Sequence, residues 1–279
     1  MNVLLTGGAG TVGTAITDHL ADRDGYQLTS VDPEPHPDPD VESVEADVGD
    51  YEAVRPHFED QDAVVHLAHA PIEGGGPSDR SIGAFEGHLA NLEIHANAYA
   101  AAVDAGVDTF VYASSNHAVG LYEVEHAPDV YFPDYDLTVD HTVQPRPDSM
   151  YGVEKVYAEG LGRLAAEAHD MQVYALRICA VRDTEYDHPY GDAEAGVDRG
   201  EFERDSDAYA TQVARMKGMW QSRRDHAQMV ERCFADETVE FDVFYGVSDN
   251  DRRWFDIDHA RDVLGYEPED NGEEWEGRP

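Results

Sequence analysis

Short apolar runs alternate along the chain with longer segments whose apolar residues recur at helical spacing. Such runs are typical of strands buried on both faces, and such segments are typical of helices that cover a sheet. The pattern predicts strands at 2–6, 27–31, 41–46, 62–67, 108–113, 172–178 and 239–245, and helices at 82–105, 149–168, 208–222, 225–233 and 258–264. This alternation predicts an α/β fold with a doubly wound parallel sheet.

The length of 279 residues suits one main domain with a small appendage. We assign 1–180 to the main domain, 181–266 to a smaller part and 267–279 to an acidic tail. Within the smaller part, 183–207 is acidic, contains glycine, proline and tyrosine, and has little periodicity. It is expected to be an inserted surface segment, either a solvated loop or a lid.

A glycine-rich turn joins the first predicted strand to a helix that carries Ala15, Ile16 and Leu20 at helical spacing. The turn has the pattern Thr-Gly-x-x-Gly-x-x-Gly, which lets the backbone approach a pyrophosphate at the helix N-terminus. In this context the pattern favours dinucleotide binding over a merely structural turn. The expected contacts are Gly7, Gly10, Thr11, Val12 and Gly13.

The ends of the next two strands carry carboxylates. Asp32 lies about twenty residues beyond the turn, where it can accept hydrogen bonds from both ribose hydroxyls of adenosine. Glu34 follows and no arginine is near, so a 2′-phosphate would be repelled and NAD is favoured over NADP. Asp47 and Val48 could hold the adenine edge, although Asp47 could equally cap a helix.

Polar residues also follow two central strands. Leu67, Ala68 and His69 lie at the carboxyl end of the 62–67 strand, where ligands of parallel sheets bind. The sequence Ser-Ser-Asn-His occupies 114–117, directly after the 108–113 strand, and this clustering favours catalysis over a simple turn. We expect Ser115 to supply a catalytic hydroxyl and His117 to contact substrate rather than to pack within its loop.

Tyr151 and Lys155 stand four residues apart in a helix-forming context, so both side chains share one helix face. A nearby ammonium lowers the pKa of a phenol, which makes the tyrosine a better base. Lysine is rare here, because Lys155 and Lys217 are the chain's only two. The pair therefore completes a predicted catalytic set with Ser115.

The composition is strongly acidic, with a formal net charge of −40. This charge excludes nucleic acid and acidic membranes as partners, and 41% hydrophobic residues argue for a folded chain. Scarce lysine and abundant carboxylates predict a protein of a high-salt cytoplasm. The two cysteines are expected to be free buried thiols, and neither a metal-ligand cluster nor an apolar run of membrane-spanning length is evident.

Taken together, the motifs resemble those of the extended short-chain dehydrogenases/reductases. Thr6 to Gly13, Asp32, Asn91, Ser115, and Tyr151 with Lys155 follow the order and spacing of that superfamily. Within it the chain is most similar to the uronate dehydrogenases and the NAD-dependent glucose-6-phosphate dehydrogenases of salt-loving archaea. The shared stretches are 113–120, 145–152, 215–220 and 245–251.

This resemblance implies roles for individual residues. Ser115, Asn116 and His117 would contact a sugar, Arg215 would face the anionic group at its far end, and Lys155 would also hold the nicotinamide ribose. Leu67, Ala68, His69, Asn91, Tyr151 and Lys155 join the cofactor-binding set. The resemblance also implies a homo-oligomer and makes 181–266 the substrate-binding part.

The expected reaction is oxidation of the anomeric hydroxyl of a sugar acid, a sugar phosphate or a neutral aldose to the lactone, with NAD as hydride acceptor. Tyr151 would act as general base, and Ser115 would orient the reacting oxygen. Two alternatives stay open. One is a sugar-nucleotide epimerase or dehydratase that retains its NAD, and the other is a non-catalytic NAD-binding regulator.

Overall fold

The computed structural model describes residues 1–72, 80–82, 85–133 and 135–278. Within these ranges, parallel strands form a seven-stranded sheet in the order β3-β2-β1-β4-β5-β6-β7. The strands are β1 Asn2–Thr6, β2 Gln27–Asp32, β3 Glu42–Glu45, β4 Ala63–His66, β5 Thr109–Ser115, β6 Gln172–Ile178 and β7 Phe241–Gly246. The predicted doubly wound α/β fold is confirmed.

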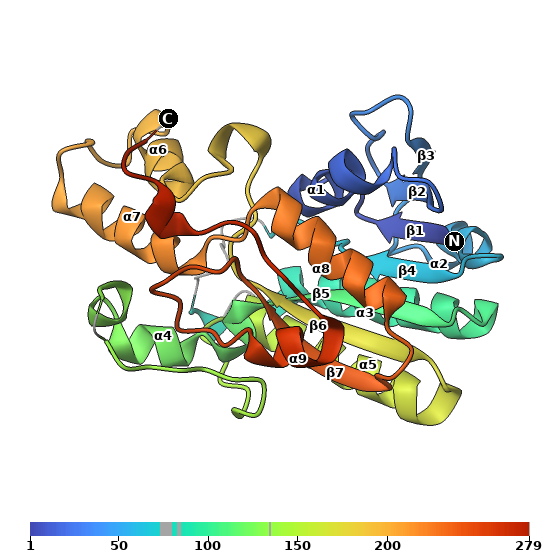
Figure 1. Cartoon of the computed structure of the whole chain (residues 1–279). Helices are drawn as coiled ribbons and strands as arrows, with labels where there is room; N and C mark the ends of the chain where they lie inside the picture. Colours follow the sequence, from blue (N-terminus) through green and yellow to red (C-terminus); the bar gives the residue numbers. More distant parts are fainter. Residues whose placement is uncertain (73–79, 83–84, 134, 279) are drawn as a thin grey trace.

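Helices cover both faces of the sheet (Figure 1). Their bounds are α1 Thr11–Leu20, α2 Tyr51–Val54, α3 Phe85–Ala105, α4 Leu121–His126, α5 Met150–His169, α6 Gly191–Asp198, α7 Asp207–Met219, α8 Arg223–Ala235 and α9 Asp258–Leu264. α3 packs against α5 on one face, while α1 packs against α8, and α8 against α9, on the other. α4, α6 and α7 lie beyond the carboxyl ends of the strands (Figure 1).

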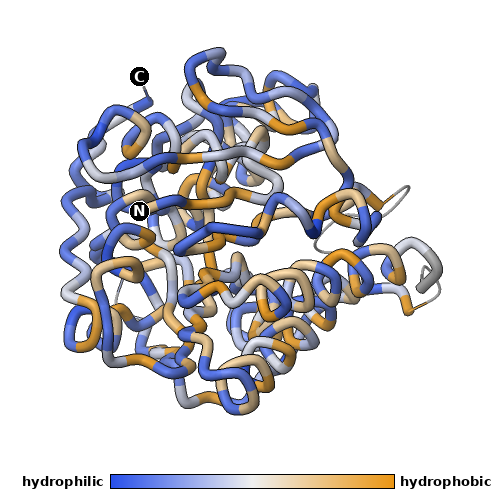
Figure 2. Tube along the Cα trace, turned by 90° about the vertical axis from the view of Figure 1, so that its right-hand side faces the viewer, coloured by the Kyte–Doolittle hydropathy of each residue, from blue (hydrophilic) through white to orange (hydrophobic). Residues whose placement is uncertain are grey.

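Alternate residues of each central strand enter two separate cores. In β1, Val3 and Leu5 join the core on the α1 and α8 side, whereas Leu4 joins the core on the α3 and α5 side. Side chains alternate across a strand, so burial on both faces requires an unbroken apolar run. Figure 2 shows these hydrophobic stretches in the centre of the trace, with hydrophilic residues dominating its outer turns.

The topology brings several strand ends together. β1 lies between β2 and β4, so the chain order reverses beside β1 and opens a crevice at the carboxyl ends of β1 and β4. Ligands of open α/β sheets bind at such a switch point. The glycine turn after β1, the residues after β4 and the polar end of β5 therefore share one edge.

The acidic segment 183–207 contains more structure than expected. It forms a short 3-10 helix and α6, in which Gly191 and Ala193 are buried. Gly196 lies against the ring of Phe202, where an added Cβ would meet the ring at 2.4 Å. The expected solvated loop is therefore wrong, because small residues let α6 pack closely while its acidic side chains obscured the helical pattern.

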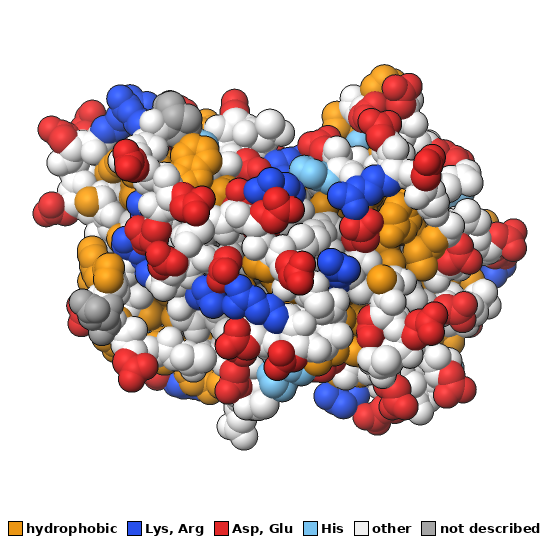
Figure 3. Space-filling view, viewed as in Figure 1, with side chains coloured by type: hydrophobic (Ala, Val, Ile, Leu, Met, Phe, Trp, Pro, Cys, Tyr) orange, Lys and Arg blue, Asp and Glu red, His pale blue; other side chains and the backbone are white. Residues whose placement is uncertain are grey.

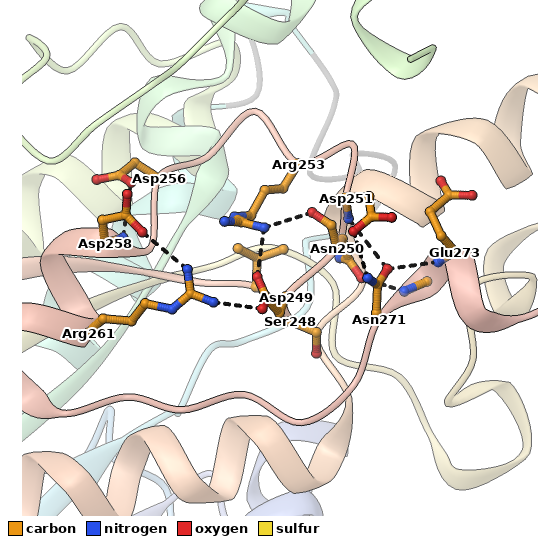
Figure 4. Close-up of polar contacts among 12 residues, drawn as sticks. Ser248, Asp249, Asn250, Asp251, Arg253, Asp256, Asp258, Arg261, Asn271 and Glu273 are labelled. Carbon is orange, nitrogen blue, oxygen red and sulfur yellow. Dashed lines mark hydrogen bonds and ion pairs between the residues drawn. The ribbon is translucent and has the colours of Figure 1, made fainter. Parts of the chain in front are cut away.

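The predicted acidic tail is also corrected, because residues 267–278 pack on the body of the protein. Two backbone N–H groups of this segment donate hydrogen bonds to the buried carboxylate of Asp225, at 2.8 and 3.2 Å. The amide of Gly272 donates to Asn250 at 2.8 Å, and the Asn271 side chain donates to Asp251 at 2.8 Å (Figure 4). Backbone donors hold the segment, and side-chain composition does not reveal them.

Candidate active site

The glycine turn adopts a conformation that larger residues would not fit. Gly7 has a φ of +76°, and a Cβ there would lie 2.7 Å from the backbone nitrogen of Ala68. A Cβ on Gly13 would lie 2.3 Å from the carbonyl oxygen of Gly8. The turn therefore packs directly on the segment after β4 and brings α1 close behind it.

The geometry of this turn fits a dinucleotide. Gly10 is the N-cap of α1 and provides no side-chain cap, so the first N–H groups of the helix, at Thr11 and Val12, suit a pyrophosphate. At the end of β2, the Asp32 carboxylate accepts hydrogen bonds from the backbone nitrogens of Ala9, at 3.3 Å, and Glu34, at 3.0 Å. These two hydrogen bonds hold the Asp32 carboxylate where it is expected to accept hydrogen bonds from the adenosine ribose.

Other predicted cofactor residues have structural partners. Val48 is buried in the core, and the Asp47 carboxylate accepts a hydrogen bond from the Gly49 amide at 2.8 Å. Asp50 rather than Asp47 caps α2. Asn91 is buried on α3 and makes two hydrogen bonds to the backbone of one residue after β4, at 2.7 and 3.2 Å. Asn91 thus shapes the loop after β4, and Asp47 is exposed just after the end of β3.

A cavity of about 510 Å³ lies at the shared strand edge. Its lining brings together many of the predicted residues, namely Val12, Leu67, His69, Ser115, Asn116, His117, Tyr151 and Lys155. Further lining residues, which sequence reasoning did not single out, include Ile178, Cys179, Val181 and Arg182 at the end of β6 and just beyond it. The fold therefore gathers the predicted catalytic set in one cavity.

Ser149 is the N-cap of α5, the helix that carries Tyr151 and Lys155. Its hydroxyl accepts a hydrogen bond from the Gly152 amide at 3.1 Å and so caps α5. Lys155 then lies one turn beyond Tyr151, with its ammonium 5.2 Å from the centre of the phenol ring. The Lys155 ammonium also donates to the carbonyl oxygen of Ala113 on β5, at 2.9 Å. Helix spacing and the strand together fix both groups.

Burial controls the protonation of both groups in the free protein. It raises the pKa of Tyr151 to about 12, although a hydrogen bond with Ser115 opposes this shift. It lowers the pKa of Lys155 to about 8, against the attraction of Glu154 and Glu159. In the protein alone, desolvation therefore raises the pKa of Tyr151, which was expected to be lowered.

Two histidines flank the tyrosine. The rings of His69 and His117 lie edge-on to the Tyr151 ring, with centroid distances of 5.1 and 5.5 Å. Nδ1 of His117 lies 2.9 Å from the Asp148 carboxylate, just before the N-cap of α5. This contact orients the histidine in the cavity, where a sugar contact was predicted.

Arg215, predicted to face an anion, has a carboxylate partner. Its guanidinium donates to both oxygens of Glu123, at 2.6 and 3.3 Å. This ion pair raises the pKa of Arg215 even though burial acts in the opposite direction. Sequence reasoning missed Glu123. This residue belongs to no recognisable motif and lies on α4, in a stretch for which the sequence predicted neither a strand nor a helix.

Arg215 lines a second cavity, of about 480 Å³, which adjoins the first. Four residues line both cavities, namely Asn116, His117, Cys179 and Arg182. The segment after β6 supplies much of the second lining, with Asp192, Arg199, Glu201 and Phe202. This segment, for which a lid was one of two expectations, thus forms part of the wall of this cavity, and its Asp192 pairs with Arg182, another lining residue.

A parallel sheet with this glycine turn and with serine, tyrosine and lysine at its switch point defines a short-chain dehydrogenase/reductase. Residues 3–182 match the family described as the NAD dependent epimerase/dehydratase family. The chain belongs to this family, whose cofactor is NAD.

Several characterised proteins resemble the chain over nearly its full length. An NAD-dependent glucose-6-phosphate dehydrogenase of Haloferax volcanii is 38% identical, covering 99% of this chain and 97% of its own. A uronate dehydrogenase of Pseudomonas putida is 30% identical, covering 97% of this chain and 85% of its own. The crystal structure of a uronate dehydrogenase mutant from Agrobacterium tumefaciens, complexed with NAD, has a TM-score of 0.72 at 27% identity, covering 98% and 86%.

Proposed function

We propose that the protein oxidises the anomeric hydroxyl of a sugar that carries an anionic group, such as a sugar phosphate or a uronate, to the lactone. The observation that carries this proposal is the single cavity in which Ser115, Tyr151 and Lys155 meet, next to a second cavity that contains Arg215. The relatives named above, sugar dehydrogenases of this family, support the same reaction class.

Each catalytic residue has a distinct role in this proposal. Tyr151 takes the proton of the anomeric hydroxyl, and Ser115, which lines the same cavity, orients the reacting oxygen. Lys155 favours the phenolate and holds the nicotinamide ribose. When bound, NAD supplies the hydride acceptor and a positive charge at the nicotinamide. The glycine turn and Asp32 hold its pyrophosphate and adenosine ribose. The other residues proposed to contact NAD are Asp47, Val48, Leu67, Ala68, His69 and Asn91.

The second cavity accommodates the anionic end of the sugar. Glu123 uses Nε and one N–H of Nη2 of Arg215, so Nη1 and the second N–H of Nη2 are left for substrate among the described contacts. Asn116 and His117 lie between the two cavities and contact the sugar ring. An arginine can bind a carboxylate or a phosphate through paired hydrogen bonds, so the phosphate or carboxylate shares Arg215 with Glu123.

The two alternatives differ from this proposal in what happens to NAD. An epimerase or dehydratase retains its cofactor, whereas the relatives named above are dehydrogenases. A regulator needs no catalytic set, whereas this chain assembles serine, tyrosine and lysine in one cavity. We therefore favour net oxidation with release of NADH.

The test follows NADH absorbance in molar KCl with NAD and one sugar at a time. The panel contains glucose 6-phosphate, glucuronate, galacturonate, L-arabinose and glucose. Stoichiometric NADH with an anionic sugar supports the proposal and identifies the substrate. NADH with a neutral sugar alone would keep the chemistry and overturn the role of Arg215, while no NADH with any sugar would overturn the proposed reaction.

The cellular setting and assembly are part of the proposal. Figure 3 shows Asp and Glu side chains spread over the viewed face, which suits a cytoplasm of high salt. None of the described helices is long and apolar enough to span a membrane. Exposed apolar side chains on α3 and α5, including Leu89, Val153, Tyr157 and Leu164, suit a homo-oligomer interface. Light scattering in molar KCl measures the assembly.

A further inference from the structure

Glu154 is a buried carboxylate beside the proposed catalytic tyrosine. It lies on α5 three residues after Tyr151, and its side chain is only 1% exposed. A charge this deeply buried is costly unless it is paired and hydrogen-bonded. Its partners are two histidines from other parts of the fold, so the carboxylate joins three elements behind the cavity.

The two histidines differ in what else they contact. Nε2 of His69, on the loop after β4, lies 2.9 Å from one oxygen of Glu154. Nδ1 of His88, on α3, contacts the other oxygen. His69 lines the catalytic cavity and packs edge-on against Tyr151, whereas His88 is buried and is not part of the cavity lining.

The carboxylate fixes which nitrogen of His69 carries the proton. An ionised carboxylate only accepts hydrogen bonds, so Nε2 of His69 must be the N–H donor. Burial lowers the pKa of His69, although the contact with Glu154 opposes this shift, and a neutral ring therefore keeps Nδ1 as an acceptor. Among the described residues, Nδ1 of His69 has no protein partner.

We propose that Glu154 is a positioning residue that holds His69 as a hydrogen-bond acceptor for a ligand hydroxyl beside Tyr151. The inference rests on the proposed dehydrogenase function. His117, which also packs edge-on against Tyr151 and is held by Asp148, forms a similar arrangement of histidine and carboxylate. The hydroxyl belongs either to the nicotinamide ribose or to the sugar carbon next to the reacting one, since both groups carry hydroxyls within a site of this kind.

Three variants test whether Glu154 positions His69 or only stabilises the fold. His69→Phe keeps an aromatic ring against Tyr151 and removes both nitrogens, while Glu154→Gln keeps the size of the side chain and removes the charge that fixes the tautomer. His88→Phe is the matched control, because it removes the other partner of Glu154 outside the cavity. Thermal melting in molar KCl shows that each variant is folded and reports its loss of stability.

The expected result is a rise in one Michaelis constant. Loss of one hydrogen bond weakens binding by roughly tenfold, so His69→Phe raises the KM of one ligand by about that factor while kcat changes less. Glu154→Gln raises the same KM by a smaller factor than His69→Phe does. The double variant has the same KM as His69→Phe alone. His88→Phe lowers the melting temperature and leaves both KM values unchanged.

Separate measurements identify the source of the hydroxyl. A ribose contact raises the dissociation constant for NADH, followed by its fluorescence in the absence of sugar. A sugar contact leaves NADH binding unchanged and removes the preference for the sugar over its 2-deoxy analogue. The inference is overturned if His69→Phe and His88→Phe change KM equally, or if neither ligand binds more weakly to His69→Phe.

A readout independent of turnover distinguishes this inference from the proposed reaction. Histidine-selective 15N NMR, assigned with His69→Phe, is expected to show Nε2 protonated and Nδ1 unprotonated in the wild-type protein. In Glu154→Gln the signals are expected to shift toward a mixture of tautomers. The same tautomer mixture in both proteins would refute positioning by Glu154 even in an active enzyme, whereas absent turnover with a fixed tautomer would refute only the reaction.

Discussion

Replacing Lys155 with methionine is expected to stabilise the protein while it abolishes activity. Lys155 is buried with its ammonium against the Ala113 carbonyl, and burial lowers its pKa from the ordinary 10.5 to about 8. The unfolded chain therefore binds this proton more tightly than the folded protein does. The resulting cost is fully present below about pH 8 and disappears as the pH rises through 10.5.

The lowered pKa of Lys155 determines how much the free energy of unfolding changes. At pH 7 the difference between 10.5 and about 8 corresponds to a cost of about 3 kcal/mol, and at pH 10 about 1 kcal/mol remains. Methionine fills a similar volume without a charge, and loss of the hydrogen bond to Ala113 removes about 1 kcal/mol at both pH values. The net gain is thus about 2 kcal/mol at pH 7 and close to zero at pH 10.

Urea unfolding in molar KCl at the two pH values measures this gain. Lys217→Met is the control, because Lys217 is the other lysine and lies within 3.5 Å of Glu273, so its replacement should bring no gain. A Lys155→Met variant that is less stable than wild type at pH 7, or whose difference from wild type is the same at pH 7 and pH 10, would refute the reasoning.

Four further outcomes are expected. Tyr151→Phe lowers kcat by about a thousandfold and leaves NADH binding, measured by fluorescence, unchanged. Glu123→Gln frees Arg215 and lowers the KM of an anionic sugar several-fold but not that of a neutral one; equal changes would contradict the assigned role. Gly13→Ala places a Cβ 2.3 Å from the Gly8 carbonyl and should abolish NADH binding in titrations. Raising KCl from about 0.5 to 2 M should lower the KM of anionic sugars only, because salt screens repulsion by the net charge of −40.

Local signals were sufficient to predict the sheet and the glycine turn. Buried parallel strands need unbroken apolar runs, and these were visible along the chain. Gly7 and Gly13 were predicted to allow a close backbone approach, and each lacks room for a Cβ. The helix predicted at 149–168 is also present as α5, with Ser149 as its N-cap.

Long-range pairing was not predictable from these signals. Glu123 and Arg215 are 92 residues apart in the chain, and His88 and Glu154 are 66 apart. No periodicity or motif links such pairs, because contacts across layers of the fold create them. Packing of α6 was missed for a related reason, since its acidic residues outweighed its buried glycines in the composition, and two of them, Asp192 and Glu194, form ion pairs with arginines outside the helix.

Ion pairing determines how so acidic a protein can bind an anion. Around the second cavity, Arg182 is paired with Asp192 and Arg215 with Glu123. These pairs keep the arginines fixed, because an unpaired guanidinium would be costly in a buried site. In the proposed function, an arriving anion therefore shares a guanidinium with a resident carboxylate rather than meeting a free positive charge. The proposal then predicts that affinity depends on how well Glu123 tolerates a second anion, so that the Glu123–Arg215 pair, and not Arg215 alone, selects the substrate.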